Sequence, residues 1–457
     1  MKRIFLGILT GLVVLSVVAW RLKPAPMEGK TPLVWVSDDN PVRREQIEIF
    51  NRLHPKYQLA LDPNNTGTQK IIVQSLAGIG PDIFDIYGRW SMYMFAEAGM
   101  VMDITDVARK RGFGLKDTWP EVRSTISIDG RQYGYPCNLC GTVLLYNKNV
   151  FDKYKVPYPP KGPWRWDDLV KIAKKLTHQK IDGSGFDSFG LIGADYYNLL
   201  IQNGASVYDK KGVYCVMDSP RAVEAIQFYY DLMFKYHVMP TPEDMVLMGG
   251  EGGWGAGTLK WFGSERVAMI YGARWQLITF RKYPDLRIGA THLPFKRVDT
   301  NLVNSRFAAV NKNSKHVEGA LVFLKYLAGR EYSMHLLECT DSMPGNPIYA
   351  TEKNMDDPEH PEEDFNAIFP EAIRKGKPME ISRLINPFQA GRTIQRHLDL
   401  MNSKVKSAKQ ACRDITDEIN RGIEKNLARF PKYRQTFKEL TGKDWKPGIP
   451  LREQVGK

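Results

Sequence analysis

The pattern of apolar and polar positions near the start of the chain predicts a β-α-β unit. Residues 33–36 form a short apolar run, and Pro41 suits the first position of the helix that follows. A second apolar run at 57–61 predicts the next strand. Ligands of open α/β folds bind beyond the carboxyl ends of such strands. The polar residues after the first strand, Asp38, Asp39 and Asn40, are therefore candidate ligand contacts.

The middle of the chain predicts a passage between two structural units. Asp129-Gly130 lies between β-prone residues and predicts a tight hairpin. Residues 142–147 are apolar on both faces, which suits a strand in a covered sheet. The Pro-rich segment 156–160 then leads to a helix that we expect Asp167 to cap.

Two later segments complete the pattern of elements. Residues 307–310 predict a strand that returns to the first unit, and 388–427 are expected to be largely helical. The expected apolar face of that helical segment comprises Ile394, Leu398, Met401, Val405, Ala408, Cys412, Ile415, Ile419 and Ile423.

The N-terminus carries a targeting signal. Lys2 and Arg3 precede an apolar run at 4–20, which is the pattern of a signal peptide with a cleavage site near Ala19. The run is also close to the length that a membrane-spanning anchor needs. Both interpretations export the rest of the chain.

Charge and cysteine content limit the function classes. The formal net charge is +13, but Lys and Arg are interspersed with Asp and Glu, and no nucleic-acid-binding motif is present. We therefore expect no nucleic-acid partner, although a polyanion-binding protein stays open as an alternative. Cys137 and Cys140 have a redox-type spacing without the helix that should follow, and a disulfide between them stays open. We expect no metal and no cofactor.

Several motifs resemble one protein family. The segments concerned are Gly78–Ile83, Phe95–Thr105, Gly134–Pro136, Leu145–Lys148, Trp166–Leu169, Ser219–Phe228 and Phe262–Trp275. In order and spacing they resemble family 1 extracellular solute-binding proteins, the maltose-binding-protein-like receptors of ABC sugar importers. The segment that ends in Gly272–Trp275 is the most specific of these matches, although Arg274 stands where many relatives carry Pro.

The resemblance implies an α/β fold with two lobes of the type II periplasmic-binding-protein kind and a ligand cleft between them. It implies hinges near 136–142 and 294–306. Lobe 1 is expected at 31–136 and 296–345, lobe 2 at 137–295 and 346–430, a signal peptide or anchor with its linker at 1–30, and a basic tail at 431–457.

The resemblance further implies reversible binding of a carbohydrate, delivery to ABC permease subunits, a monomer, and a periplasmic or extracellular location. A non-sugar or acidic ligand is the alternative. A carbohydrate-active enzyme is a weaker alternative, because no G-x-S-x-G or H-E-x-x-H motif is present.

The expected site combines aromatic faces with polar groups, as sugar rings require. The aromatic candidates are Trp90, Tyr196, Tyr197, Trp254 and Trp275, for which core packing is the competing interpretation. The polar candidates are Asp38, Asp39, Asn40, Arg89, Asn138 and Asn346, with helix capping as the alternative for Asp39. Arg89 and Arg274 lie beside aromatic residues and would suit an acidic sugar, or they form surface ion pairs.

Overall fold

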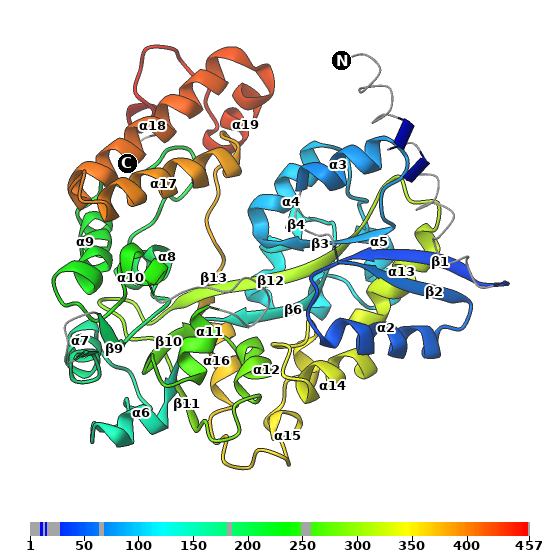
Figure 1. Ribbon diagram of the computed structural model, residues 1–457. Coiled ribbons are helices and arrows are strands. Elements are labelled where there is room, and N and C mark those ends of the chain that lie inside the picture. Colours follow the sequence, from blue (N-terminus) through cyan, green and yellow to red (C-terminus); the bar gives the residue numbers. More distant parts are fainter. Residues whose placement is uncertain are drawn as a thin grey trace.

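The protein is an α/β molecule with two lobes, shown by a computed structural model that describes residues 10–11, 14–15, 28–63, 68–180, 185–247 and 257–455. Figure 1 shows the lobes side by side, with strands running from one to the other. The predicted N-terminal apolar segment falls mainly outside the described residues, and Trp254 falls outside them completely. Within these ranges no helix is sufficiently long and apolar to cross a membrane.

The first lobe is built on the larger sheet, whose strand order is β13-β12-β3-β1-β2, with β6 paired to β12. Its strands are β1 (Thr31–Val36), β2 (Tyr57–Asp62), β3 (Ile83–Tyr87), β6 (Tyr135–Gly141), β12 (Asn301–Val310) and β13 (Gly376–Lys377). The helices of this lobe are α2 (Val42–Leu53), α3 (Thr68–Leu76), α4 (Gly88–Glu97), α5 (Thr105–Arg111), α13 (Val317–Leu327) and α14 (Arg330–Glu338).

The parallel strands of the first lobe confirm the predicted β-α-β unit. β1 pairs in parallel with both β2 and β3, and Val36 lies opposite Phe84. The loops that follow β1 and β3 therefore leave the sheet at the same edge, where α2 and α4 begin. The apolar faces of α2 and α13 pack on this sheet through Phe50 and Phe323, whose rings meet edge to face.

The second lobe is built on a smaller sheet with the strand order β10-β7-β11. The strands are β7 (Val143–Asn147), β10 (Met269–Gly272) and β11 (Ile288–Thr291). Every residue of β7 is buried, as its continuous apolar run predicts. The helices around this sheet are α6 (Lys148–Lys153), α7 (Trp166–Lys175), α8 (Tyr196–Gln202), α9 (Pro220–Phe234), α10 (Pro242–Leu247), α11 (Thr258–Gly263), α12 (Leu277–Phe280), α15 (Glu352–Met355) and α16 (Ile368–Lys375).

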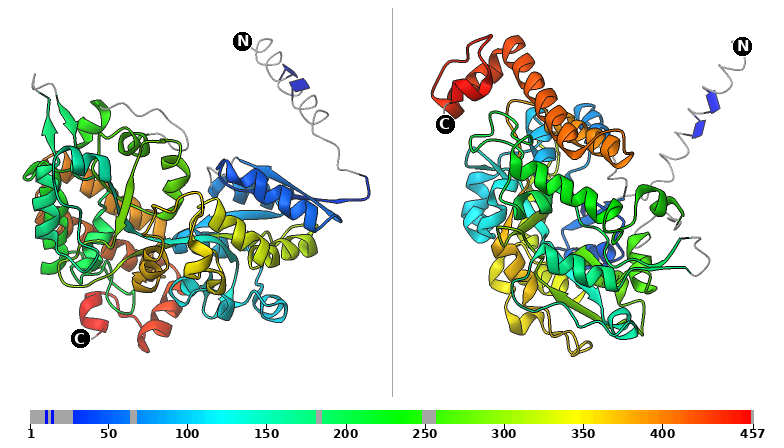
Figure 2. Two further views of the ribbon diagram at one scale, coloured as in Figure 1. Left: turned by 90° about the horizontal axis from the view of Figure 1, so that it is seen from below. Right: turned by 90° about the vertical axis from the view of Figure 1, so that its left-hand side faces the viewer.

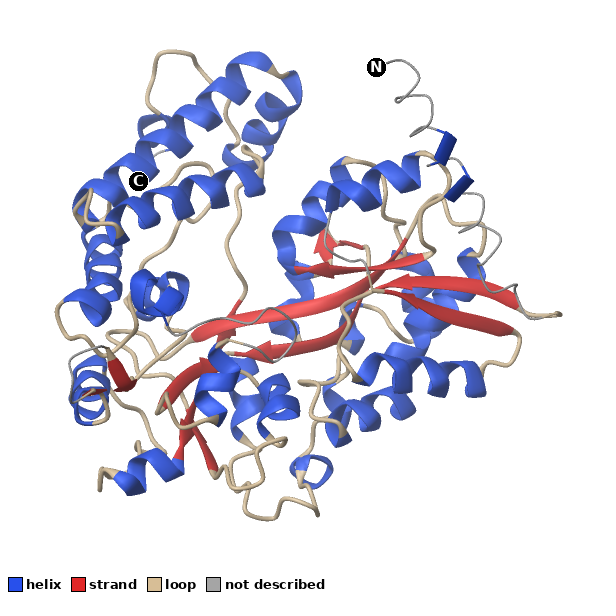
Figure 3. Cartoon of the chain, viewed as in Figure 1, coloured by secondary structure: helices blue, strands red, loops and turns tan. Residues whose placement is uncertain are grey.

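Two strands connect the lobes. β12 pairs with β3 in the first lobe through Arg306–Val310, and its first residues pair with β13. β6 runs antiparallel to β12 over the same stretch, and Figure 3 shows the two strands extending together across the molecule. The division of the chain at 136 and 296 stays a prediction: β6 continues through 136, and 296 precedes the first residue of β12.

The C-terminal helices form a compact group on the second lobe. They are α17 (Pro387–Asn402), α18 (Ala408–Arg429), α19 (Pro431–Thr441) and α20 (Leu451–Val455), and Figure 2 shows α18 and α19 at one end of the molecule. The basic segment predicted as a tail from 431 is thus folded as far as Val455. Phe437 and Leu451 are buried in the core of the second lobe and hold it there.

The long C-terminal helical segment is interrupted, which differs from the predicted single apolar face. α17 ends at Asn402 and α18 begins at Ala408, and Val405 in the turn between them is exposed. Lys404 in this turn has φ +60°, a left-handed conformation that ends a helix. The two helices can then pack against each other through their apolar faces.

Two local predictions have different outcomes. The Asp129-Gly130 hairpin is confirmed, since β4 (Ser127–Ile128) and β5 (Arg131–Gln132) pair in antiparallel fashion and both turn residues have positive φ. β8 (His178–Gln179) and β9 (Phe186–Ser188) also pair in antiparallel fashion.

The cap predicted at Asp167 is wrong, because α7 is preceded by Arg165 and Asp167 lies in its first turn. A carboxylate at this position interacts favourably with the positive end of the helix dipole, although it does not cap the helix.

Candidate functional site

Two adjoining cavities lie at the edge of the first sheet where the lobes face each other. The larger has a volume of about 510 Å³ and is lined from α4, β6, β12 and the loop after β1. The smaller, of about 350 Å³, is lined from α4, α8, the segment before α17, and α17 itself. Both cavities include Trp90 and Met379 in their walls. They therefore form one cleft with two compartments.

The larger cavity contains six of the predicted site residues: Asp38, Asn40, Arg89, Trp90, Asn138 and Trp275. Tyr196 and Tyr197 line the smaller cavity together with Trp90. Asp39 and Asn346 line neither cavity. The cleft thus brings together predicted residues that lie as far apart in the sequence as Asp38 and Trp275.

The ligand contacts predicted for Asp39 and Asn346 stay predictions, although neither residue lines the cleft. The Asp39 side chain is exposed, and Pro41 is the N-cap residue of α2, which has no side-chain cap. The Oδ1 of Asn40 accepts a hydrogen bond from the backbone N–H of Val42 at 3.1 Å. Asn346 caps the short 3-10 helix Pro347–Tyr349, where its Oδ1 accepts a hydrogen bond from the backbone N–H of Ile348 at 3.2 Å. Local capping accounts for the Asn346 side chain.

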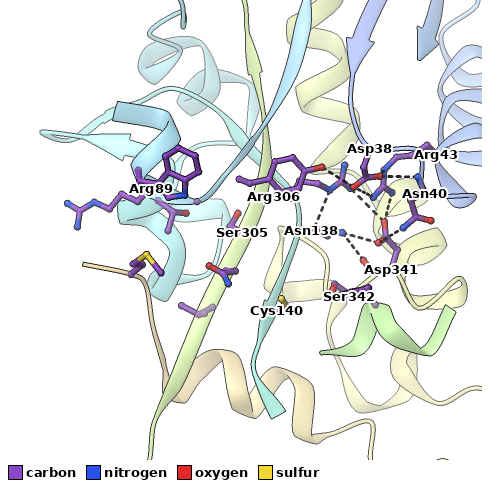
Figure 4. Close-up of a pocket in the computed structure, with 18 residues that line it drawn as sticks. Asp38, Asn40, Arg43, Arg89, Asn138, Cys140, Ser305, Arg306, Asp341 and Ser342 are labelled. Carbon is purple, nitrogen blue, oxygen red and sulfur yellow. Dashed lines mark hydrogen bonds and ion pairs between the residues drawn. The ribbon is translucent and has the colours of Figure 1, made fainter. Parts of the chain in front are cut away.

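A buried ionic cluster forms one wall of the larger cavity (Figure 4). Arg43 of α2 lies 2.9 Å from Asp38 and 2.5 Å from Asp341, measured between guanidinium nitrogen and carboxylate oxygen. Arg306 of β12 lies 2.7 Å from Asp85 of β3 in the same way. Both arginines are nearly inaccessible to solvent, so each needs its carboxylate partners to offset the cost of burying charge.

Asp341 connects the cluster to β6. Its carboxylate accepts a hydrogen bond from Nδ2 of Asn138 at 3.0 Å, and Nη2 of Arg306 lies 3.7 Å from it. The neighbouring residues Thr340 and Ser342 have φ +56° and +68°, a conformation that is strained for residues with a side chain. The contacts of Asp341 with both lobe-connecting strands offset this strain and fix the loop.

The cluster holds Asp38 in its charged form. Burial alone would raise the pKa of Asp38, but the positive charges of Arg306 and Arg43 and two hydrogen bonds outweigh it and lower this pKa to about 2. One of those hydrogen bonds is donated by the phenol of Tyr87 at 2.9 Å. Burial and the nearby charge of Asp85 raise the pKa of Tyr87, so its phenol stays protonated and remains a donor.

The smaller cavity is predominantly aromatic. Its walls include the rings of Trp90, Tyr196, Tyr197, Tyr208 and Phe388. Among them lies the carboxylate of Glu380, which accepts a hydrogen bond from the backbone N–H of Val207 at 2.9 Å. Burial raises the pKa of Glu380, although backbone hydrogen bonds oppose the rise. Aromatic faces thus surround an acceptor that forms no ion pair within the described part of the chain.

The consecutive residues Arg274 and Trp275 have different roles. Trp275 is half-buried and lines the larger cavity. Arg274 is 1% exposed and donates hydrogen bonds to the backbone carbonyls of Leu337 at 2.9 Å and Ser342 at 3.2 Å. Burial lowers its pKa to about 10. Arg274 lines neither cavity, and its Nη atoms donate to backbone carbonyls at and after the carboxyl end of α14, so we expect it to support the fold and not to contact a ligand.

Cys137 and Cys140 are free thiols, although a disulfide between them was an open alternative. The Cys137 Sγ lies 3.5 Å from Asp85, whereas Cys140 lines the larger cavity. Burial raises the pKa of both thiols. Within the described residues no cluster of His, Cys, Asp and Glu could hold a metal ion.

The sequence interpretation missed several residues of the cleft: Arg43, Tyr87, Tyr208, Arg306, Asp341, Glu380 and Phe388. Arg306 lies in a segment that was expected to be a hinge. Asp341 follows α14 and Glu380 follows β13, both in loops that carry no motif. A signal for Arg43 was available, since a charged residue in the first turn after a ligand-binding loop lies at the sheet edge.

Comparison with known proteins identifies the type of fold and a family. Residues 37–334 match the family model described as bacterial extracellular solute-binding protein. A putative binding protein of Brucella abortus (strain 2308) is 25% identical over 242 residues, which cover 50% of this chain and 54% of that protein. The chain thus spans about half the length of the curated relatives it matches.

Solved structures resemble almost the whole of the described chain. An ABC substrate-binding protein of Listeria monocytogenes in complex with cycloalternan has a TM-score of 0.74 at 19% identity, with 86% of this chain and 98% of that chain covered. A maltose-bound protein of T. maritima has a TM-score of 0.69 at 20% identity, with 85% and 98% covered. These similarities confirm the predicted two-lobe α/β fold of the periplasmic-binding-protein kind.

Proposed function

The chain belongs to the bacterial extracellular solute-binding protein family, and from this premise we propose that it binds an oligosaccharide reversibly in the cleft between its lobes. The family consists of binding proteins, and we propose that this member performs no chemistry on its ligand. The similar structures were solved with cycloalternan and with maltose, both of which are carbohydrates. The cleft itself provides the principal support for this proposal.

The observation that carries the proposal is the combination of aromatic faces and polar acceptors in the two compartments. Sugar rings have apolar C–H faces that stack on aromatic rings, and hydroxyls that need fixed hydrogen-bond partners. Trp90, Tyr196 and Trp275 are each partly accessible at the cleft. Glu380 in the smaller cavity and Asp38 in the larger can accept hydrogen bonds from hydroxyls.

The size of the cleft favours a ligand of more than one sugar. The two compartments meet at Trp90, so a chain stacked there would place a sugar unit in each. Trp90 comes from α4 of the first lobe, and Phe388 comes from α17 of the second. A ligand that contacts both lobes favours their closed arrangement by its additional affinity for that state.

We further propose that the protein acts outside the cytoplasm as a monomer and delivers its ligand to the permease subunits of an ABC transporter. The family description and the charged and apolar N-terminal residues support export. Mass spectrometry of the native N-terminus will distinguish cleavage near Ala19 from a retained anchor. Recovery of the intact chain in the cytoplasm would contradict both.

The proposed ligand class is testable by a thermal-shift screen of neutral and acidic oligosaccharides, followed by calorimetry and analysis of the recovered sugar. A ligand at one hundred times its Kd should stabilise the protein by about 2.7 kcal/mol, which is a clear rise in melting temperature. The sugar should be recovered unchanged. Cleaved sugar would indicate an enzyme, and binding of nucleic acid with a steep salt dependence but of no oligosaccharide would contradict the proposal.

A further inference from the structure

Two arginine side chains flank the point where the compartments meet. Arg89 precedes Trp90 in α4, and its Nε is buried without a hydrogen-bond partner within the described residues. Arg392 of α17 lies with its guanidinium carbon 4.7 Å from the centroid of the Phe388 ring. No described carboxylate lies within 4.0 Å of either guanidinium group.

The arginines of the ionic cluster provide a contrast. Arg43 and Arg306 are nearly inaccessible and bind carboxylates of the protein, so their charges are largely offset within it. Figure 4 shows Arg89 on the opposite side of the larger cavity, with its side chain directed away from this cluster. Arg89 lines the larger cavity, and its guanidinium carbon lies 5.8 Å from the centroid of the Tyr93 ring in the same helix, so a described carboxylate does not offset its charge.

The positive charge of Arg89 acts on Tyr197 of the second lobe. Burial raises the pKa of Tyr197, and the positive charge of Arg89 partly offsets this effect across the cleft. Tyr197 lines the smaller cavity, whereas Arg89 lines the larger. Trp90, which follows Arg89 in α4, lines both compartments, so Arg89 lies next in the chain to the ring on which a sugar would stack.

The local backbone adds to the positive potential. Arg89 lies in the first turn of α4, which contains no acidic residue and has no side-chain cap. The N-terminal end of a helix carries a partial positive charge, so a cation placed there is unfavourable unless an anion approaches. The sequence has thus placed a full positive charge where the fold already supplies a partial one.

From these positions we propose that Arg89, assisted by Arg392, selects an oligosaccharide that carries an oxyanion, either a uronic acid carboxylate or a sulfate ester. This inference rests on the proposed carbohydrate function and narrows its ligand class. A guanidinium group donates two parallel hydrogen bonds to such a planar or tetrahedral oxyanion, which a neutral hydroxyl cannot match.

The one cleft carboxylate that forms no ion pair within the described residues fits this ligand. Glu380 lies in the smaller cavity, where Val207, Tyr208 and Ser206 donate hydrogen bonds that hold it in place. It can accept hydrogen bonds from the hydroxyls of a sugar that stacks on the aromatic rings. An anionic substituent would then point toward Arg89, away from the carboxylate.

The test is calorimetry on the full-length exported protein with matched pairs of oligosaccharides. One pair is a tetragalacturonate and the same tetrasaccharide after reduction of its carboxyl groups. The other is a carrageenan tetrasaccharide and its desulfated form. The best neutral oligosaccharide of the thermal-shift screen serves as the reference for carbohydrate binding. The two pairs distinguish carboxylate from sulfate as the source of the oxyanion.

Variants at Arg89 separate charge recognition from folding. Arg89→Gln keeps a long side chain with good helix propensity but removes the charge. We expect it to weaken binding of the acidic member by about tenfold to a hundredfold and to leave the neutral member within about twofold. Arg89→Lys keeps the charge without the paired donors of the guanidinium group, and it should recover part of the lost affinity for the acidic member. Arg109→Gln on the exposed surface of α5 is the matched control and should change neither affinity.

The outcomes separate this inference from the broader function. An acidic member that binds at least tenfold more tightly than its neutral counterpart, with a preference that falls in high salt and is lost in Arg89→Gln, supports the inference. Equal or tighter binding of neutral saccharides, or an Arg89→Gln variant that weakens both members alike, overturns it while the carbohydrate function stands. Failure of every saccharide to bind the folded protein overturns the proposed function and this inference with it.

Discussion

Trp90 of the first lobe stacks on Phe388 of the second, with ring centroids 5.9 Å apart and ring planes inclined by 28°. Both rings line the smaller cavity, and Trp90 also lines the larger one. Two ion pairs also join the first lobe to the C-terminal part of the chain: Lys432 with Glu97 at 3.3 Å, and Arg383 with Asp129 at 3.2 Å. The stack therefore holds the lobes together where a ligand would enter.

Removal of this stack should open the cleft. Phe388→Ala loses an aromatic pair that contributes about 0.5–1.5 kcal/mol to the closed arrangement, and exposed ion pairs cannot replace it. We expect a larger radius of gyration for the ligand-free protein in small-angle scattering. Phe430→Ala is the control, because Phe430 pairs with Tyr433 inside the C-terminal helices. An unchanged radius of gyration in Phe388→Ala would show that the stack does not set the closure.

Trp275 should contribute directly to ligand binding. Trp275→Ala removes an aromatic face from the larger cavity and should weaken the affinity for the oligosaccharide by about 1–3 kcal/mol, as measured by calorimetry. Trp445→Ala is the control, since Trp445 packs near the C-terminus and lines neither cavity of the cleft. Full affinity in a Trp275→Ala protein with a normal melting temperature would assign Trp275 to packing alone.

The ionic cluster should be sensitive to the loss of a single carboxylate. Asp341→Asn leaves Arg43 and Arg306 without one of their negative partners in a buried position, which should reduce the free energy of unfolding by about 3–5 kcal/mol. Denaturant unfolding measures this loss. Asp364→Asn removes an exposed partner of Lys161 and should cost at most about 1 kcal/mol. Similar small effects of both substitutions would mean that the cluster contributes little to stability.

The depressed pKa of Asp38 predicts a loss of stability in acid. The pKa falls from 3.8 in the unfolded chain to about 2 in the folded protein. The unfolded state therefore binds the proton more tightly, so the contribution of Asp38 is present above pH 4 and is lost as the pH falls toward 2. Its size is on the order of 2 kcal/mol.

Unfolding free energies measured between pH 2 and pH 5 test this effect on the protein and on Asp38→Asn. The variant should be less stable at pH 5 and should approach the unmodified protein near pH 2. Asp106→Asn, at an exposed pair with Arg109, provides the comparison. Parallel pH profiles for the protein and Asp38→Asn would contradict the assignment.

Arg274 should affect stability and not ligand affinity. Arg274→Met keeps an unbranched side chain but leaves the carbonyls of Leu337 and Ser342 without their donors, at a cost of about 1–3 kcal/mol in the free energy of unfolding. Calorimetry below the unfolding temperature should give an unchanged affinity for acidic and neutral oligosaccharides. A selective loss of affinity for acidic ligands would show that Arg274 takes part in ligand binding.

Local sequence was sufficient for the elements and for the residues next to them. The parallel unit of β1, α2 and β2 follows from apolar periodicity, and the Asp129-Gly130 hairpin follows from turn chemistry. Asp38, Arg89 and Trp90 were accessible to prediction because each lies shortly after the end of a strand of the first lobe. The carboxyl ends of adjacent parallel strands meet at one edge, whatever the rest of the chain does.

The sequence alone could not assign roles that depend on distant partners. Arg274 and Trp275 are neighbours in the chain, yet the carbonyls of α14 decide that Arg274 is buried while Trp275 faces the cleft. Arg43 meets Asp341 only because β6, β12 and the loop after α14 converge on α2. Val405 fits the apolar spacing of the predicted helix, but it is exposed because it lies in the turn between α17 and α18.

The sequence by itself therefore determined the secondary structure, the family and the edge of the sheet where ligands bind. These depend on interactions between residues close in the chain, which local spacing records. The tertiary structure decided which charges are used within the protein and which remain for a ligand. That depends on burial and on partners hundreds of residues away, since a buried charge needs a counter-charge at contact distance. Arg306 has such a partner in Asp85, and Arg89 faces the cleft.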